Sequence, residues 1–325
     1  MSTIDWLSRL LELTPASGRL EVRCLYGAPW RVVYEDSAPG EIPYHIVNAG
    51  TAVVEDPAGG PPEMLHAGDV VLMPHGSAHR LHDGSGKKPA TARYRDAPNL
   101  TVSENVGSGV RLDMLCGRFV LPPHSDRLMR AYLPARLIVR GGESAGQLAG
   151  LVALMRQESS NGNLGGDAML KALSAALFAL VLRLASEAQD APVGLMALAG
   201  SPRLAPALEA MMREPAQEWT LPRLAELCNM SRATMARHFQ EKLGRSASSL
   251  LLDIRMTLAA DELRKPGGST ERVAEKVGYN SVAAFKRVFK QHTGHTPAAW
   301  RQLGRADLMG RPAPPLNEGA APATA

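Results

Sequence analysis

The last third of the chain repeats one local pattern about fifty residues apart, first over residues 219–244 and again over 269–302. Each copy starts with a Ser or Thr that can cap a helix and continues with apolar residues recurring every three or four positions. A turn then leads to a second such stretch, which starts with a capping Ser and ends at a Gly. The chain must therefore place two pairs of short helices in its C-terminal part, each pair joined by a tight turn.

Specific residues define the ends of these predicted helices. The caps and turns are Thr220, Ser231 and Gly244 in the first copy, and Ser269 or Thr270, Gly278 and Ser281 in the second. The residues expected to face the core are Met235, Phe239 and Leu243 in the first copy, and Phe285, Val288 and Phe289 in the second. Residues 251–265 predict one amphipathic helix between the copies. Two helix pairs on one rigid helix could reach successive major-groove turns of a duplex, about 34 Å apart.

Charge is divided unevenly along the chain, whose formal net charge is +4. Residues 201–305 carry 17 Lys and Arg against 10 Asp and Glu, a net of +7. The rest of the chain carries 19 against 22, a net of −3. The basic block predicts a polyanionic partner for the C-terminal part alone. The alternative is a solvated helical domain that is basic without binding nucleic acid.

The N-terminal half has a different pattern. Over residues 20–119, short runs rich in Val and aromatic residues alternate with turn residues, which predicts a sandwich or barrel of antiparallel strands. Residues 84–110 are polar and rich in Pro and Gly, so we expect a long loop there. Helical periodicity appears in residues 1–13, 147–156 and 167–188. The last stretch is apolar on more than one face, which predicts either packing against a second copy of the chain or a buried helix.

Composition excludes several classes of protein. With 45% apolar and 21% charged residues, the chain is neither wholly disordered nor fibrous. It has no apolar run of about 18 residues and no export-signal pattern at its start, so we expect a cytoplasmic protein without a membrane partner. Its three cysteines, Cys24, Cys116 and Cys228, are widely spaced and odd in number, which argues against a disulfide scaffold.

The second copy of the repeated pattern carries a family resemblance. It matches A-x2-V-G-Y-x-S-x3-F-x-R-x-F-K-x3-G-x-T-P-x3-R from Ala274 to Arg301, and the first copy and the intervening helix share further positions. Over about a hundred residues the chain thus resembles the AraC/XylS family of transcription regulators. The resemblance implies a regulator, most often an activator and not an enzyme, that binds double-stranded promoter DNA, contacts RNA polymerase and forms a homodimer.

Carried over position by position, the resemblance implies DNA contacts from the second helix of each pair. These residues are Arg232, Ala233, Ala236 and Arg237 in the first pair, and Asn280, Val282, Ala283, Lys286 and Arg287 in the second. Arg suits guanine or phosphate, Asn suits adenine, and Val or Ala suits a thymine methyl group. Small residues in the first set predict that the second pair carries more of the specificity. Segment 245–247 lacks the usual Pro, so we expect a looser start of the following helix.

The segment from Gly68 to His79 fits G-x5-P-x-G-x2-H, which resembles the second motif of cupin barrels. In such barrels the last His points inward and can ligate a metal. The first cupin motif, with its His-x-His, is not recognisable and a single His45 stands near its place, which argues against a catalytic metal site. Cys24, Cys116, His45 and His79 would have zinc-site composition if they converge, although a single barrel His is more often structural and a buried Cys more often inert.

The N-terminal half as a whole resembles the cupin-type sensor domain of the reactive-chlorine-responsive activators in the same family. The resemblance implies that Cys24 and Cys116 are a redox pair, with His45 and His79 as candidate zinc ligands beside them. No cofactor is expected to be required. Strand alternation should turn the arginines adjacent to the two cysteines toward the opposite face of the sheet.

The predicted fold is α+β, with an N-terminal cupin-like β-barrel flanked by helices and a C-terminal all-α domain with two helix-turn-helix units. The predicted parts are residues 1–190 as sensor and dimerisation domain, 191–200 as linker, 201–305 as DNA-binding domain and 306–325 as disordered tail. Two other hypotheses stay open. The barrel could bind a small organic effector, with the cysteines incidental, or it could be a cupin metalloenzyme whose helical part is an interaction module.

Overall fold

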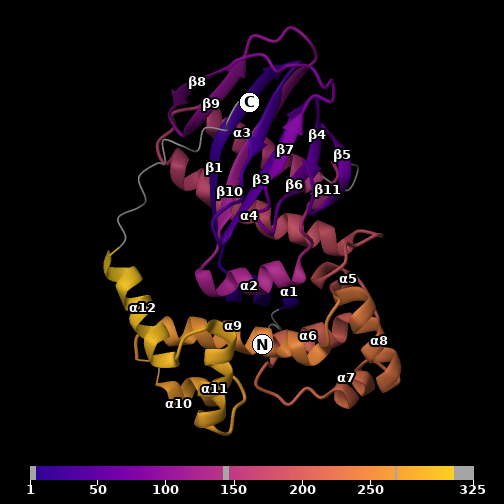
Figure 1. Ribbon diagram of the computed structural model, residues 1–325, viewed down its shortest axis with the longest axis vertical. Coiled ribbons are helices and arrows are strands. Elements are labelled where there is room, and N and C mark those ends of the chain that lie inside the picture. The colour runs from indigo at the N-terminus through magenta and orange to yellow at the C-terminus, as the bar shows by residue number, and fades with distance from the viewer. Residues whose placement is uncertain (1–4, 142–145, 268, 311–325) are drawn as a thin grey trace. The chain divides into compact units, whose positions relative to one another are not determined.

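The computed structural model describes residues 5–141, 146–267 and 269–310 (Figure 1). By their internal contacts these residues form two compact units. The barrel unit comprises the described residues from Pro15 to Pro192, and the helical unit comprises those before Pro15 and those from Val193 onward. Helix α1 (Trp6–Leu13), expected in the sensor domain 1–190, therefore belongs to the helical unit, where it packs against α6 (Ala205–Arg213).

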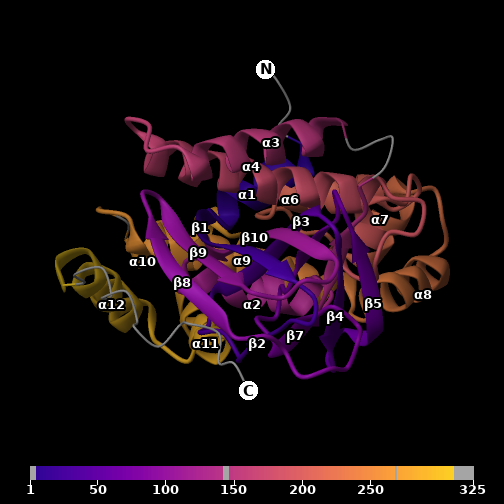
Figure 2. The same cartoon turned by 90° about the horizontal axis from the view of Figure 1, so that it is seen from above.

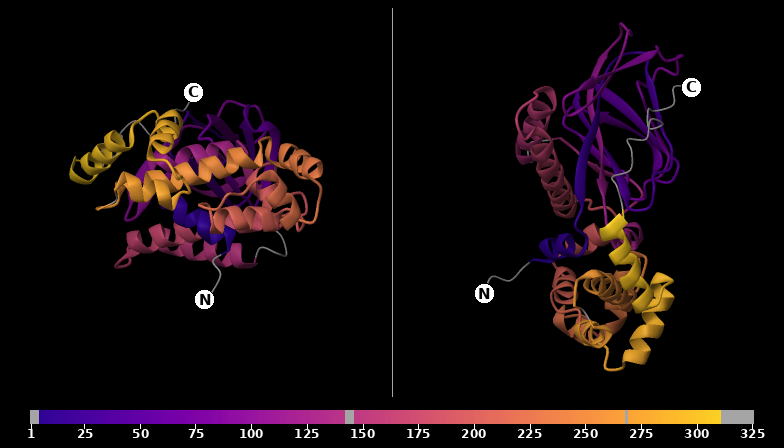
Figure 3. Two further views of the ribbon diagram at one scale, coloured as in Figure 1. Left: turned by 90° about the horizontal axis from the view of Figure 1, so that it is seen from below. Right: turned by 90° about the vertical axis from the view of Figure 1, so that its left-hand side faces the viewer.

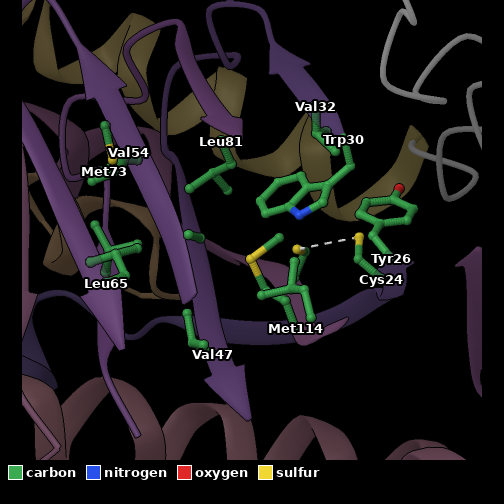
Figure 4. Packing of buried hydrophobic residues seen from close by; sticks show 14 residues of the cluster. Cys24, Tyr26, Trp30, Val32, Val47, Val54, Leu65, Met73, Leu81 and Met114 are labelled. Carbon is green, nitrogen blue, oxygen red and sulfur yellow. Dashed lines mark hydrogen bonds between the residues drawn. The ribbon is translucent and has the colours of Figure 1, made fainter. Parts of the chain in front are cut away.

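The strands of the barrel unit pair antiparallel, as predicted, except for the parallel pair of β1 with β9. They are β1 (Ser17–Gly27), β2 (Arg31–Tyr34), β3 (Glu41–Ala49), β4 (Thr51–Asp56), β5 (Gly60–His66), β6 (Val70–Leu72), β7 (His79–His82), β8 (Ala92–Ala97), β9 (Leu100–Asn105), β10 (Arg111–Val120) and β11 (Leu137–Val139). Within the described residues they form a seven-stranded sheet, β11-β6-β3-β10-β1-β9-β8, and a four-stranded sheet, β2-β7-β4-β5. Inward-facing residues of both sheets share one apolar core, which includes Val54, Leu65, Leu81 and Met114 (Figure 4).

The expectation of a loop over residues 84–110 is wrong for its central part, which contains β8 and β9. Strand β9 pairs in parallel with β1 and antiparallel with β8. Val102 and Ser103 of β9 are buried, whereas β8 lies at the sheet edge and is largely exposed. An edge strand needs few apolar residues, because water can solvate its outer face, so composition alone hides it.

Helices α2 (Pro123–Tyr132), α3 (Gly146–Ser160) and α4 (Gly166–Glu187) complete the described part of the barrel unit. Helices α3 and α4 lie side by side, and α4 covers the outer face of the larger sheet along β1 (Figure 2). Phe178 of α4 packs on Phe119, with ring centroids 4.8 Å apart. Among the described helices, α4 alone is long and apolar enough to cross a membrane, a test that core helices of soluble proteins also pass.

Beside α1 and α6 the helical unit contains α5 (Leu195–Ala199), α7 (Leu221–Leu227), α8 (Arg232–Leu243), α9 (Ala247–Arg264), α10 (Thr270–Lys276), α11 (Val282–Thr293) and α12 (Pro297–Gly310). Within the helical unit, α9 packs against α1, α10 and α12; most of the unit is orange to yellow in Figure 3. Two boundary predictions need correction. The predicted linker 191–200 contains α5, because Leu195, Met196 and Leu198 are apolar enough to be buried there. Helix α12 extends into the predicted tail 306–325, of which residues 311–325 lie outside the described part.

Candidate functional site

The two predicted helix pairs are α7 with α8 and α10 with α11. The second helix of each pair begins directly after a capping serine. Ser231 accepts a hydrogen bond from the backbone N–H of Thr234 (3.1 Å), and Ser281 accepts one from that of Ala284 (3.3 Å). Both helices end at a glycine in the left-handed conformation, and each is 12 residues long. The prediction of two matched pairs is confirmed.

Helices α8 and α11, hereafter the recognition helices, each have one buried and one exposed face. Met235 and Phe239 of α8 are fully buried, as are Phe285 and Phe289 of α11. The predicted DNA-contact residues lie on the other faces, and all are exposed except the partly buried Val282. They are Arg232, Ala233, Ala236, Arg237, Asn280, Val282, Ala283, Lys286 and Arg287. Both recognition helices can therefore present these side chains to a duplex.

The two recognition helices differ in electrostatics. On α8, Glu241 lies 3.6 Å from Arg237 and 3.4 Å from His238, so an acidic group competes for these side chains. On α11, neither Lys286 nor Arg287 forms an ion pair with any other described residue. The second helix thus offers more uncompensated positive charge to a phosphate or a guanine edge.

The departure from the family pattern at residues 245–247 does not loosen the following helix. Ser246 caps α9 by accepting a hydrogen bond from the N–H of Ser249 (3.2 Å). A side-chain cap satisfies one of the free N–H groups of the first turn, so the helix begins sharply without a Pro. The expectation of a looser start is wrong.

In the barrel unit, Cys24 and Cys116 face the shared interior. Strand β1 places Cys24 opposite Met114 of β10, and Cys116 lies opposite Val22, so the two cysteines are diagonal neighbours on adjacent strands. Their Sγ atoms are 4.0 Å apart and both residues are buried. Figure 4 shows Cys24 beside Tyr26, with a dashed line to the sulfur of Cys116. A covalent bond between them would need the two sulfurs to approach to about 2.05 Å.

The surroundings hold the Cys116 thiol in its protonated form. Burial and the neighbouring Cys24 raise the pKa of Cys116 well above its ordinary value, and a hydrogen bond with the Tyr34 hydroxyl opposes this rise more weakly. The two nearby arginines do not help, because each is engaged with carboxylates. Arg23 lies on the opposite face from Cys24, as alternation predicted, whereas Arg118 is two positions from Cys116 and shares its face, so the prediction is wrong there. Arg23 forms two hydrogen bonds with Asp113, and Arg118 pairs with carboxylates of β1 and β3.

Two buried histidines join the two sheets. The Nε2 atoms of His45 on β3 and His79 on β7 are 2.8 Å apart. Because Nδ1 of His79 lies 2.8 Å from the carbonyl oxygen of Ser77, that Nδ1 carries the proton and its Nε2 accepts. His45 then donates from Nε2, which leaves its buried Nδ1 without a partner. Burial lowers the pKa of both imidazoles, so both are neutral at neutral pH.

Tyr34 of β2 links the thiol pair to the imidazole pair. Its ring stacks on His79 with centroids 4.7 Å apart and also lies 4.7 Å from His45. Its buried hydroxyl interacts with Cys116. Sequence reasoning missed this residue, because a Tyr at the end of a strand is common. Its only signal is that it shares a strand face with the core residue Val32.

The four predicted zinc ligands come together as two pairs, one of thiols and one of imidazoles. Among the described residues, no group of three or more His, Cys, Asp or Glu side chains could hold a metal ion. A zinc centre normally takes at least three protein ligands. In this arrangement the two thiols and the two imidazoles do not form a zinc centre. Whether the protein binds zinc stays a prediction.

A basic helical unit with two exposed recognition helices, joined in one chain to a barrel unit, is the organisation of a DNA-binding regulator with a separate N-terminal domain. A family model described as cupin matches residues 5–187, and one described as helix-turn-helix domain matches residues 224–303. The chain belongs to the cupin family through its N-terminal half and is a DNA-binding transcription regulator of the AraC family. It is therefore a regulator and not a metalloenzyme.

Individual relatives resemble almost the whole chain. An uncharacterized HTH-type transcriptional regulator of Haemophilus influenzae is 28% identical, over 92% of this chain and 99% of its own. The RCS-specific HTH-type transcriptional activator RclR of Escherichia coli is 28% identical, over 93% and 99%. Among solved structures, the DNA-binding domain of AdpA in complex with a target DNA is 26% identical, over 32% of this chain and 99% of that one, with a TM-score of 0.32.

Proposed function

We propose that this regulator is an activator whose barrel unit senses an active-chlorine oxidant through Cys24 and Cys116. The observation that carries the proposal is the 4.0 Å separation of the two buried Sγ atoms. Two thiols at this distance reach disulfide bonding length if the sulfurs approach by about 2 Å. The likeness to an RCS-specific activator over nearly the whole chain supports the same class of signal.

The chemistry needs one equivalent of hypochlorous acid. Its electrophilic chlorine replaces the proton on one sulfur, forming an S–Cl bond, and water leaves. The second thiol attacks this sulfur, forming the S–S bond, while chloride departs and the thiol proton passes to water. Two thiols are oxidised to a disulfide and hypochlorous acid is reduced to chloride and water. Because an S–S bond is about 2.05 Å long, the sulfurs must approach, and we propose that the resulting shift of β1 against β10 is the signal.

Burial of the thiol pair supports selectivity for this class of oxidant. The raised pKa of Cys116 keeps its thiol protonated at neutral pH. Peroxides react with thiolates and therefore attack such a sulfur slowly. Hypochlorous acid is small, neutral and strongly electrophilic, so it can enter the barrel and react even with the small fraction of thiolate that remains.

On the DNA side, we infer that both recognition helices contact one promoter duplex. The second pair would supply more of the sequence preference than the first, through Asn280, Lys286 and Arg287. On α8 of the first pair, Glu241 competes with DNA for Arg237. RNA polymerase is the proposed protein partner. The proposed compartment is the cytoplasm, where promoter DNA is.

The outer face of α3 and α4 supports a homodimer. One face of α4 packs on β1, whereas Ala168, Ala172, Ala175 and Ala176 form an exposed small-residue stripe along it. Leu154 of α3 is 50% exposed nearby on the adjacent helix. A second copy placed on this stripe would bury it and allow close approach of two helices.

The alternative of an organic effector is less well supported. A recess bordered by Tyr26, Trp30, Arg31 and Tyr94 encloses about 10 Å³, which is room for about one water molecule. A drug-sized or metabolite-sized ligand would need this recess to open widely, since ligand pockets are usually about 300 Å³ or more.

Promoter output under hypochlorous acid tests the proposed function. Strains would carry the wild-type chain, Cys24→Ala, Cys116→Ala, or Cys228→Ala as the matched control in the helical unit. We expect the first two variants to lose induction and Cys228→Ala to respond like the wild type. Undiminished induction in both barrel variants would rule out cysteine sensing. The DNA contact is tested separately: loss of basal operator binding by Arg287→Ala would support it whatever the cysteine variants do.

A further inference from the structure

One guanidinium within the helical unit touches both helix pairs. Arg255, near the middle of α9, is half-buried. Its Nε donates to the carbonyl of Pro215 (2.7 Å), and its Nη2 donates to the carbonyls of Gln217 (2.8 Å) and Ala216 (3.3 Å). These three carbonyls belong to the loop that leads from α6 into α7, the first helix of the first pair. Arg255 therefore ties α9 to the first pair through consecutive backbone groups.

The same guanidinium lies against the second pair. Its Cζ is 6.0 Å from the ring centroid of Tyr279, in the turn between α10 and α11. The Tyr279 ring packs edge-on against Phe285 of α11, with centroids 5.7 Å apart. The next residue is Asn280, one of the predicted DNA contacts. A movement at Arg255 would thus reach the start of the second recognition helix.

A glycine brings the loop and the turn into direct contact. Gly278 has φ +79°, and a Cβ built on it would lie 2.2 Å from the carbonyl oxygen of Ala216. The position needs glycine both for its left-handed conformation and for this close approach. The Ala216 carbonyl is therefore held between Arg255 and the turn of the second pair.

We propose that Arg255 is a positioning residue that sets the spacing between the recognition helices α8 and α11, and hence the half-site spacing that the protein accepts in DNA. This inference rests on the proposed contact of both helices with one duplex. Each pair has its own buried aromatic core, centred on Phe239 in the first and on Phe285 and Phe289 in the second, so each can stay folded without the guanidinium. Two linked contacts add their binding energies fully only when both fit at once.

The test uses the full chain and a duplex that the wild-type protein selects from random-sequence DNA, with its half-sites located by footprinting. Arg255→Gln removes the shared contact. Arg223→Gln is the matched control, because Arg223 stacks over Trp219 at 4.7 Å and bonds only to residues of the loop before α7. Each protein is titrated with the selected duplex, with duplexes carrying one scrambled half-site, and with a duplex carrying one inserted base pair. The insertion moves the half-sites apart by about 3.4 Å and rotates them by about 34°.

We expect Arg255→Gln to bind the selected duplex about tenfold more weakly, and duplexes with a scrambled half-site within about twofold of the wild type. The inserted base pair should lower the affinity of Arg255→Gln less than it lowers the affinity of the wild type. It should lower the affinity of Arg223→Gln as much as that of the wild type. Arg255→Lys, which retains charge over Tyr279 but not the planar fork, should fall between.

An equal loss on every duplex, or an unchanged insertion penalty, would overturn the proposal. If circular dichroism shows Arg255→Gln to be unfolded, the same duplex titrations are made with Tyr279→Leu. This variant removes the ring and leaves the hydrogen bonds of Arg255 in place. A wild-type footprint that covers only one half-site would contradict the two-helix contact as well as the positioning role. Failure of the cysteine variants to alter induction would leave this test unaffected.

Discussion

The Sγ atoms of Cys24 and Cys116 lie 4.0 Å apart, although 92 positions separate the two residues in the chain. Adjacent antiparallel strands β1 and β10 bring them together, one as the diagonal neighbour of the other. Because both cysteines are buried in the barrel, the fold makes each the disulfide partner of the other on oxidation, and collision with other thiols does not. Several measurable consequences come from this site and from the recognition helices.

Stoichiometric hypochlorous acid should convert Cys24 and Cys116 to an intramolecular disulfide. Peptide mass spectrometry after alkylation would show one cross-linked peptide pair and a free Cys228, which is on a different unit and has no thiol neighbour among the described residues. Cys24→Ser and Cys116→Ser should each abolish the cross-link. A cross-link between copies of the chain in its place would contradict an intramolecular sensor.

Tyr34→Phe should slow oxidation of the thiol pair by several-fold. The hydroxyl of Tyr34 lowers the pKa of Cys116 against the effect of burial, so its loss leaves less thiolate at any pH. The ring stays in place against His79. Stopped-flow oxidation followed by thiol titration measures the rate. Tyr44→Phe is the control, because the hydroxyl of Tyr44 lies 3.3 Å from that of Ser174 and not beside Cys116. Equal rates in all three proteins would remove Tyr34 from the mechanism.

The buried histidine pair predicts acid sensitivity of the barrel unit. Burial lowers the folded-state pKa of His45 and His79 below the ordinary 6.5, so the unfolded chain binds more protons below that pH. The free energy of unfolding should be constant above about pH 7 and fall below about pH 6.5, by up to about 1.4 kcal/mol per pH unit for each histidine.

Urea unfolding of the full chain at several pH values measures this slope. His45→Gln should flatten it, whereas His66→Gln, at an exposed position, should not. A slope unchanged by His45→Gln would assign the acid sensitivity to other groups. Metal analysis of the same purified protein would test the zinc prediction directly.

Arg287→Ala on α11 should weaken operator binding by about 1–3 kcal/mol and relax the preference at one base pair, if Arg287 contacts a guanine edge. Lys286→Ala should lower affinity for all sequences and reduce the salt slope by about one unit, as expected for a phosphate contact. Arg203→Ala, exposed before α6, is the control. Shift assays at several salt concentrations separate the two effects, and matching losses from Arg203→Ala would show a general charge effect only.

Ala172→Glu should dissociate the proposed dimer, because it places a charge in the small-residue stripe of α4. Sedimentation velocity at several concentrations would show a monomer for this variant and a concentration-dependent dimer for the wild type. Arg183→Glu, exposed near the end of the same helix, controls for the change of charge. A wild-type chain that stays monomeric at every concentration would rule out this interface.

Local interactions explain why the helix pairs were predictable. The caps formed by Ser231 and Ser281 use hydrogen bonds that span three residues, and a glycine ends each recognition helix. The apolar spacing then places Phe239 and Phe285 in the core. Every such interaction lies within one helical turn or a few residues, so the order of amino acids contains it directly.

The proposed sensor site depends on contacts that no local pattern contains. Strand pairing across distant segments decides that Cys116 meets Cys24 and that His45 meets His79, and it places Tyr34 between them. The strands within residues 84–110, the edge strand β8 and its neighbour β9, escaped prediction for the same reason, since pairing and not composition defines them.

The sequence by itself therefore predicted the helix pairs, because short-range capping and periodicity define them. The resemblance of its motif to the AraC/XylS family implied the class of protein and the candidate DNA contacts. The resemblance named the two cysteines and the two histidines, but only the tertiary structure decided that they meet as two separate pairs, and that Arg255 connects the loop before α7 with the turn of the second helix pair. The physical reason is range: a hydrogen bond or sulfur contact between strands depends on register and packing, which arise only when the whole sheet forms.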